Sequence, residues 1–114
     1  MTSPVDYFEI GSPDPAASTA FYGGLFGWDV EAPTGPAPYS MVDGDKGGLW
    51  DTSASGGQTW AIFYVQVDDV AAAVARAEEL GGSVGHPLTD NGRIEFAHLV
   101  DPHGNRLGVW RPKG

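Results

Sequence analysis

Residues 60–82, WAIFYVQVDDVAAAVARAEELGG, contain the pattern that decides the fold. The stretch from Trp60 to Val67 alternates and is rich in aromatic and β-branched residues, as β-strands are. Asp68-Asp69 can cap a helix, and apolar residues then recur at spacings of three and four from Val70 to Leu80. Gly81-Gly82 ends that helix. The stretch therefore predicts a strand followed directly by an amphipathic helix.

The first half of the chain repeats this order. A strand is predicted over residues 5–10, Asp14 can cap a helix with Pro15 in its first position, and Gly27 ends it. Each segment from capping aspartate to closing glycine spans 13 positions, and the two segments are offset by 55. The apolar side of the first helix is predicted to consist of Phe21, Tyr22, Leu25 and Phe26.

Short strands complete each half. In the first half they are predicted at 28–30, 39–42 and 49–50, and in the second half at 83–84, 94–100 and 106–110. The sequence thus predicts an α+β fold of two tandem β-α-β-β-β units, about 1–56 and 57–114, within one domain. Two such sheets side by side are expected to form a half-open barrel around a concave cleft, which is the natural ligand site.

Composition excludes several classes of function. With 41% hydrophobic and 18% charged residues the chain is globular, and its lack of cysteine excludes disulfides, thiolate metal sites and a cysteine nucleophile. The longest apolar runs are six residues, too short for a membrane span, and no signal peptide is visible, so we expect a cytoplasmic protein. The net charge of −9 argues against nucleic acid as a partner.

Three stretches resemble the vicinal oxygen chelate superfamily, which includes glyoxalase I, bleomycin-resistance proteins, fosfomycin-resistance enzymes and extradiol dioxygenases. They are the strand–helix–FYGGLFGW run at 5–28, the capped helix from Val67 to Gly82, and the turn DPHGN at 101–105. The resemblance covers nearly the whole chain in the correct order and implies the fold and a homodimer. It does not fix the function, because the superfamily contains several chemistries and some plain binding proteins.

The same resemblance locates the positions at which metal-using members carry their ligands. In this chain these positions are Tyr7, Ile62 and Gly108, with a fourth in the segment 47–50, which contains no His, Asp or Glu. Isoleucine and glycine have no ligating side chain. We therefore expect no metal and no other cofactor.

The turn at 101–105 indicates which residues face the cleft. A three-residue hairpin loop that pairs Asp101 with Asn105 sets His98 opposite Gly108, so Phe96 and Ile94 share the side of His98. The predicted ligand-binding residues are Tyr7, Glu9, Trp50, Trp60, Ile62, Tyr64, Gln66, His98, Arg106, Gly108 and Trp110. Gly108 is expected to leave room for a ligand, and aromatic faces stack on planar or cationic molecules.

Several of these residues have a structural interpretation beside the functional one. The aromatic residues fill the barrel interior equally well. An inward carboxylate such as Glu9 needs a partner, which makes it either half of a salt bridge with Arg106 or an acid that polarises a ligand. His98 is either a core histidine with satisfied hydrogen bonds or a catalytic base.

Two functions fit this pattern. The first is a metal-free protein that binds an aromatic natural product or drug, as the sequestering resistance proteins of the superfamily do, in clefts completed by a second subunit. The alternative is a glyoxalase-like lyase or isomerase. Such an enzyme would use a non-standard metal site or metal-free acid–base chemistry with Glu9 and His98 as the candidate catalytic residues.

Overall fold

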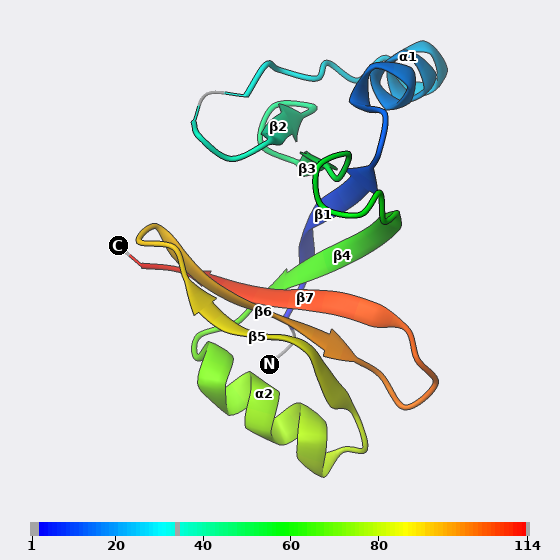
Figure 1. Ribbon diagram of the computed structural model, residues 1–114. Helices are drawn as coiled ribbons and strands as arrows, with labels where there is room; N and C mark the ends of the chain where they lie inside the picture. Colours follow the sequence, from blue (N-terminus) through cyan, green and yellow to red (C-terminus); the bar gives the residue numbers. More distant parts are fainter. Residues whose placement is uncertain (1–2, 34, 114) are drawn as a thin grey trace. The chain divides into compact units, whose positions relative to one another are not determined.

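The computed structural model describes residues 3–33 and 35–113, and the chain divides into two compact units. The first unit comprises residues 7–61, and the second comprises residues 62–114 together with 1–6. The described residues form seven strands and two helices, which confirms the α+β class (Figure 1). The order is β-α-β-β in the first half of the chain and β-α-β-β-β in the second.

The first unit is built on three strands. These are β1 (Val5–Ser12), β2 (Tyr39–Val42) and β3 (Gly47–Asp51), in the order β2-β3-β1. β3 runs parallel to β1 and antiparallel to β2. The strand predicted at 28–30 is reduced to a single bridge between Val30 and Val42, so that prediction was wrong in extent.

Helix α1 (Pro15–Phe26) begins and ends where the sequence predicts. The Asp14 side chain accepts a hydrogen bond from the Ala17 amide at 3.1 Å, and Gly27 adopts the left-handed conformation at φ 73°. The prediction of an apolar side does not translate into burial, because no α1 residue is buried and Phe21, Leu25 and Phe26 are 56–60% exposed. Tyr22 and Phe26 instead pack on the ring of Trp28, just beyond the helix.

The second unit consists of four strands and helix α2 (Val70–Glu79). The strands lie in the order β4-β7-β6-β5. Their bounds are β4 (Trp60–Gln66), β5 (Ser83–Asp90), β6 (Ile94–Val100) and β7 (Arg106–Pro112). β5 is much longer than the two residues predicted, because its pairing with β6 continues through two irregularities.

The core of the second unit lies between α2 and one face of its sheet. Val70 of α2 packs with Ala97, Leu99 and Val109, and Leu107 lies against this cluster. Leu80, predicted as part of the apolar stripe, is instead the C-cap and is 61% exposed. No helix among the described residues is long and apolar enough to cross a membrane.

The β6–β7 hairpin sets the register of this sheet. The Asp101 amide donates to the Asn105 carbonyl at 2.8 Å, and Gly104 has φ 93°. His98 therefore pairs with Gly108, as predicted. Because side chains alternate along a strand, His98 and Gly108 lie on the sheet face opposite the α2 core.

Candidate functional site

The sheet face opposite α2 carries most of the predicted site residues of the second unit. We call it the histidine face. Strand register places Phe96 opposite Trp110 and His98 opposite Gly108, and pairs Tyr64 of β4 with Gly108. Its side chains are Tyr64, His86, Phe96, His98, Arg106 and Trp110.

A short hydrogen bond joins Tyr64 to His98 at the centre of this face. The Tyr64 hydroxyl oxygen lies 2.5 Å from Nε2 of His98, and both side chains are buried. Burial, together with the positive charge of Arg106 and the neighbouring His86, lowers the pKa of His98 to about 4. His98 is therefore neutral at physiological pH and can accept the tyrosine proton in a hydrogen bond.

Gly108 makes this contact between strands feasible. A Cβ atom on Gly108 would lie 2.3 Å from Cε2 of Tyr64, so the ring occupies the space that a side chain would need. We predicted that this glycine leaves room for a ligand. The room beside Gly108 is taken up by the Tyr64 ring, which reaches over β7 to His98 on β6.

His86 belongs to the same face, although the sequence analysis did not select it. The β5–β6 pairing shifts by one residue between Val84 and His86, which leaves Gly85 as the extra residue of a bulge and pairs His86 with His98. The exposed His86 ring stacks flat on Phe96, with ring centroids 5.6 Å apart and planes parallel at 0°. A histidine before a proline in an extended segment gives no sequence signal of this bulge.

The remaining predicted residues of the second unit are Arg106, Trp110, Ile62 and Gln66. Arg106 is exposed and donates from Nη2 to the Gly85 carbonyl at 2.9 Å. Trp110 donates from Nε1 to Asp6 at 3.0 Å. Ile62 is buried, and Gln66 is exposed at the end of β4.

The other predicted residues lie on one face of the first unit and are Tyr7, Glu9, Trp50 and Trp60. We call this face, together with Tyr39, the tyrosine face. The Trp60 indole donates from Nε1 to Glu9 at 3.1 Å, and its ring covers Gly11. Trp50 lies against Tyr39, with ring centroids 5.7 Å apart. The predicted pairing of Glu9 with Arg106 joins residues of different units and stays a prediction.

Tyr39 is the residue of this face that sequence reasoning missed. Its hydroxyl shares a hydrogen bond with that of Tyr7, and its ring tip occupies the space where Gly48 would carry a Cβ atom. Burial is the main cause that raises the pKa of Tyr7, and the charge of Glu9 adds to it, whereas the hydrogen bond from Tyr39 lowers it. Tyr7 therefore stays protonated at physiological pH.

The residues at the superfamily's metal positions do not fit a divalent ion. Ile62 offers only carbon atoms, the space beside Gly108 is filled by a ring, and Tyr7 retains its proton. Within residues 3–33 and 35–113, no three His, Cys, Asp or Glu side chains lie close enough together to hold a metal ion. The donor set of a metal centre is thus missing from the described part of the chain.

Comparison with known proteins places this geometry in a family. The profile of the glyoxalase-like domain matches residues 7–110. The anthracycline biosynthesis protein DnrV of Streptomyces peucetius is 29% identical over 126 aligned positions, which cover 92% of this chain and 46% of DnrV. The chain thus spans about half the length of the curated relatives it matches.

Solved structures show the same fold at low sequence identity. A methylmalonyl-CoA epimerase of Streptomyces coelicolor, solved with 2-nitronate-propionyl-CoA, superposes with a TM-score of 0.68 at 18% identity and covers all of both chains. A member of the glyoxalase/bleomycin resistance protein/dioxygenase superfamily from Vibrio splendidus superposes with a TM-score of 0.63 at 16% identity, over 96% of this chain and 99% of its own.

Proposed function

Because this chain belongs to the glyoxalase-like domain family, we propose that it is a metal-free small-molecule-binding protein that holds an aromatic natural product or drug. The observation that carries the proposal is the histidine face, where an exposed, flat ring stack lies beside a tryptophan and a neutral histidine. Such a surface offers stacking area together with a few fixed polar groups, which is the usual chemistry of a small-molecule site.

The named relatives support the same class of ligand. DnrV and DauV are named for anthracycline biosynthesis, and we propose that this chain binds an aromatic compound of that kind, either to sequester it or to present it. The epimerases of similar fold are in complex with CoA esters, which supports a small-molecule ligand in general.

Fluorescence titration with an anthracycline tests this proposal. Phe96→Ala and Trp110→Ala, which remove one ring each from the histidine face, should weaken binding by about tenfold, because a lost aromatic contact is worth roughly 0.5–1.5 kcal/mol beyond its buried area. Trp60→Ala tests the tyrosine face in the same way. Phe63→Ala removes an exposed ring from the opposite face of β4 and is the matched control. Unchanged affinity in all three site variants would refute the proposed function.

The Tyr64–His98 pair favours a second candidate, an acid–base catalyst. A neutral histidine in hydrogen-bond contact with a hydroxyl can take up a proton from a substrate that displaces that hydroxyl. Turnover by metal-free protein, abolished in His98→Ala or Glu9→Gln, would favour this enzyme. Binding that changes by no more than a few kcal/mol in these variants, without any turnover, favours the binding protein.

We also propose that the chain forms a homodimer. Support comes from α1, which leaves Phe21, Leu25 and Phe26 more than half exposed in the single chain. Large exposed apolar side chains on one element are typical of interaction surfaces. Analytical ultracentrifugation should give a dimer for the wild type and a monomer for Phe26→Glu, and a monomeric wild type would refute the proposal.

A further inference from the structure

We propose that Arg106, beside the ring of His86, forms a subsite for an anionic oxygen group, such as a carboxylate, on the aromatic ligand. This inference rests on the proposed function, because it adds a charged anchor to the ring-lined histidine face. It also assigns a chemical class to the ligand, a planar aromatic acid.

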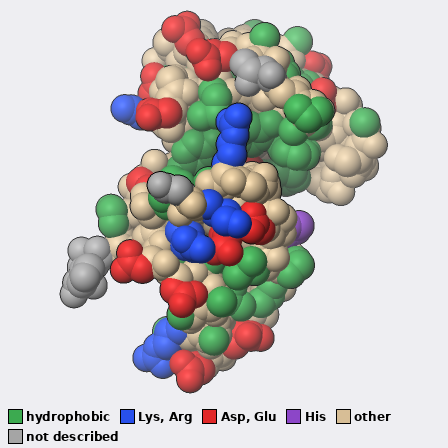
Figure 2. Space-filling model, turned by 90° about the vertical axis from the view of Figure 1, so that its left-hand side faces the viewer, with side chains coloured by type: hydrophobic (Ala, Val, Ile, Leu, Met, Phe, Trp, Pro, Cys, Tyr) green, Lys and Arg blue, Asp and Glu red, His purple; other side chains and the backbone are tan. Residues whose placement is uncertain are grey.

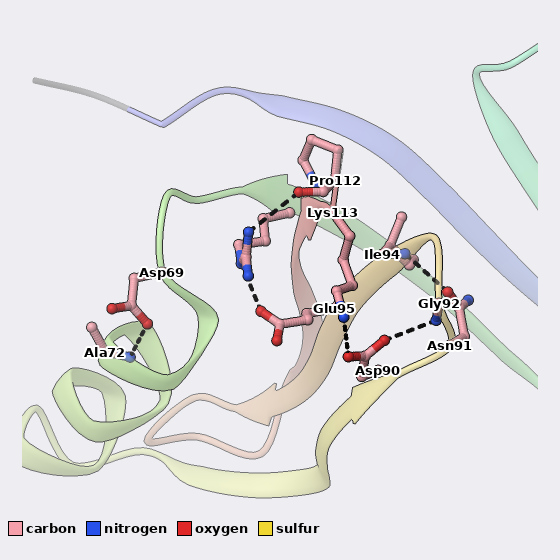
Figure 3. Close-up of polar contacts among 10 residues, drawn as sticks. Asp69, Ala72, Asp90, Asn91, Gly92, Ile94, Glu95, Pro112 and Lys113 are labelled. Carbon is pink, nitrogen blue, oxygen red and sulfur yellow. Dashed lines mark hydrogen bonds and ion pairs between the residues drawn. The ribbon is translucent and has the colours of Figure 1, made fainter.

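The first argument is the charge of Arg106. Within the described residues of its own unit, Arg106 makes no ion pair, although the chain carries 15 acidic residues. Three other cations of the second unit are matched with carboxylates, and Figure 3 shows two of these pairs beside the C-terminal end of β7. Arg93, like Arg106, makes no ion pair among the described residues of the unit. The matched pairs are Arg76–Glu79, Arg111–Glu95 and Lys113–Asp90.

Figure 2 shows the same pairing of opposite charges on one face of the molecule, where Lys and Arg side chains lie next to Asp and Glu side chains. Arg106, like Arg93, departs from it. Its guanidinium therefore carries a positive charge that no carboxylate among the described residues of its unit offsets.

The second argument is that the arginine is held in place without a carboxylate. Nη2 donates to the Gly85 carbonyl, and a Cβ atom on residue 85 would lie only 2.7 Å from that nitrogen. The glycine in the β5 bulge thus lets the side chain cross from β7 to β5. A guanidinium has five N–H donors, so this contact leaves donors for a bidentate carboxylate.

The third argument is the neighbouring histidine. Nε2 of His86 lies 3.1 Å from the Thr89 hydroxyl, and that hydroxyl donates its own proton to the Pro87 carbonyl. Thr89 therefore accepts a hydrogen bond from the Nε2–H group of His86. In the neutral ring this leaves Nδ1 as an acceptor, so His86 borders the subsite with its ring and does not donate to the anion. His86 adjoins Gly85, the anchor of Arg106, and its ring centroid is 5.7 Å from that of His98.

The distribution of carboxylates agrees with this assignment. Asp6 is a carboxylate bonded to a side chain of the histidine face, because it accepts a hydrogen bond from Trp110. Trp110 lies four residues beyond Arg106 on β7, about 13 Å along the strand. The face thus has a cationic end at Arg106 and an acidic group near Trp110, with rings between them.

Two probes that differ only in charge test the subsite. We would measure the dissociation constants of 2-naphthoate and of its neutral isostere 2-naphthamide at pH 7.5 and low salt, using the full chain. The wild type should prefer the carboxylate by about tenfold, as a charge-assisted bidentate contact warrants. Arg106→Gln should abolish the preference. His86→Gln removes a stacking ring but no donor to the anion, so it should weaken the binding of both probes and leave the preference unchanged.

Arg76→Gln is the matched control. It removes the same charge from an exposed position on α2, so it reports the general effect of net charge and should leave the preference unchanged. An equal loss of preference in Arg76→Gln and Arg106→Gln would overturn the subsite. Equal binding of both probes to the wild type would overturn the subsite but leave the proposed function standing. Binding of neither probe would overturn both.

Discussion

In both units a tyrosine ring lies over a glycine of the last strand, but its hydroxyl meets a different partner in each. In the first unit Tyr39 of β2 crosses Gly48 and bonds the phenol of Tyr7. In the second unit Tyr64 of β4 crosses Gly108 and bonds the imidazole of His98. In each unit the glycine, which has no side chain, lets the tyrosine ring cross its strand. The residue that bonds the tyrosine hydroxyl then determines the chemistry.

The difference concerns protonation. The Tyr7 phenol remains protonated over the whole physiological range, because burial raises its pKa further from neutrality. The imidazole loses its affinity for protons on burial, so His98 is neutral in the folded chain and charged in the unfolded chain at mildly acidic pH. The second unit should therefore be sensitive to pH in a way that the first is not.

The largest expected effect is on the pH dependence of stability. The pKa of His98 falls from 6.5 to about 4 on folding. The folded state therefore loses no stability through His98 above pH 6.5, and it becomes less stable relative to the unfolded state as the pH falls toward 4. The free energy of unfolding should decrease by about 3 kcal/mol over this range, beyond what carboxylates contribute. Urea denaturation of the wild type and His98→Gln at pH 7.5 and 4.5 measures it. Asp51, Asp90 and Asp101 titrate in both proteins and cancel, so equal decreases would contradict the prediction.

The second-largest expected effect is the loss of stability when a methyl group is added at each of the two glycines, and this loss should differ between the two units. Gly108→Ala places a Cβ atom against the body of the buried Tyr64 ring and should destabilise the chain by about 2 kcal/mol. Gly48→Ala meets the far end of the half-buried Tyr39 side chain, its hydroxyl oxygen and the ring carbons Cζ and Cε2. This end of the side chain can swing aside, so about 1 kcal/mol is expected. Chemical denaturation measures both values. Partial rescue of Gly108→Ala by Tyr64→Ala would confirm the cause, and additive losses would contradict it.

Removing each bridging hydroxyl should have a smaller effect. Tyr64→Phe deprives the buried Nε2 of His98 of this donor and should lower the free energy of unfolding by about 1.5 kcal/mol. Tyr39→Phe leaves the Tyr7 hydroxyl with the Met41 sulfur at 3.8 Å, and about 0.5 kcal/mol is expected. A larger loss in Tyr39→Phe than in Tyr64→Phe would reverse the comparison.

The smallest expected effect distinguishes the two helix caps. Asp14 and Asp69 each accept a hydrogen bond from the amide three residues on, at 3.1 and 3.0 Å. Asp69→Ala should lower global stability by about 1 kcal/mol, because α2 packs on the core. α1 has no buried residue, so Asp14→Ala should mainly increase local amide exchange in that helix. Global losses of equal size would show that α1 folds as tightly as α2.

Local signals in the sequence predicted much of this fold. The caps at Asp14 and Asp69 act within four residues, and the turn at 101–105 alone fixes His98 opposite Gly108. Such features depend on short-range geometry, which composition and spacing record directly. Burial was harder to predict, because an apolar pattern like that of α1 does not say which surface will cover it.

The site was predictable where strands are regular and not where they are interrupted. His86 was missed because the extra residue at Gly85 changes which side chains share a face, and no sequence pattern marked that bulge. Tyr39 was missed, and Gly108 was misinterpreted as open space, for one common reason. A glycine opposite an aromatic residue can mean room for a ligand or room for the ring itself, and only the packing distinguishes the two.

Strand β5 ends the strand order of its unit and exposes Val84 and Leu88. An exposed, regular edge with apolar side chains would be a template for uncontrolled strand addition and aggregation. Pro87 removes a backbone donor from the middle of this edge, and the two register shifts keep its remaining donors and acceptors from forming an even ladder. The same irregularity that turns His86 toward His98 thus also protects the molecule against self-association through this strand.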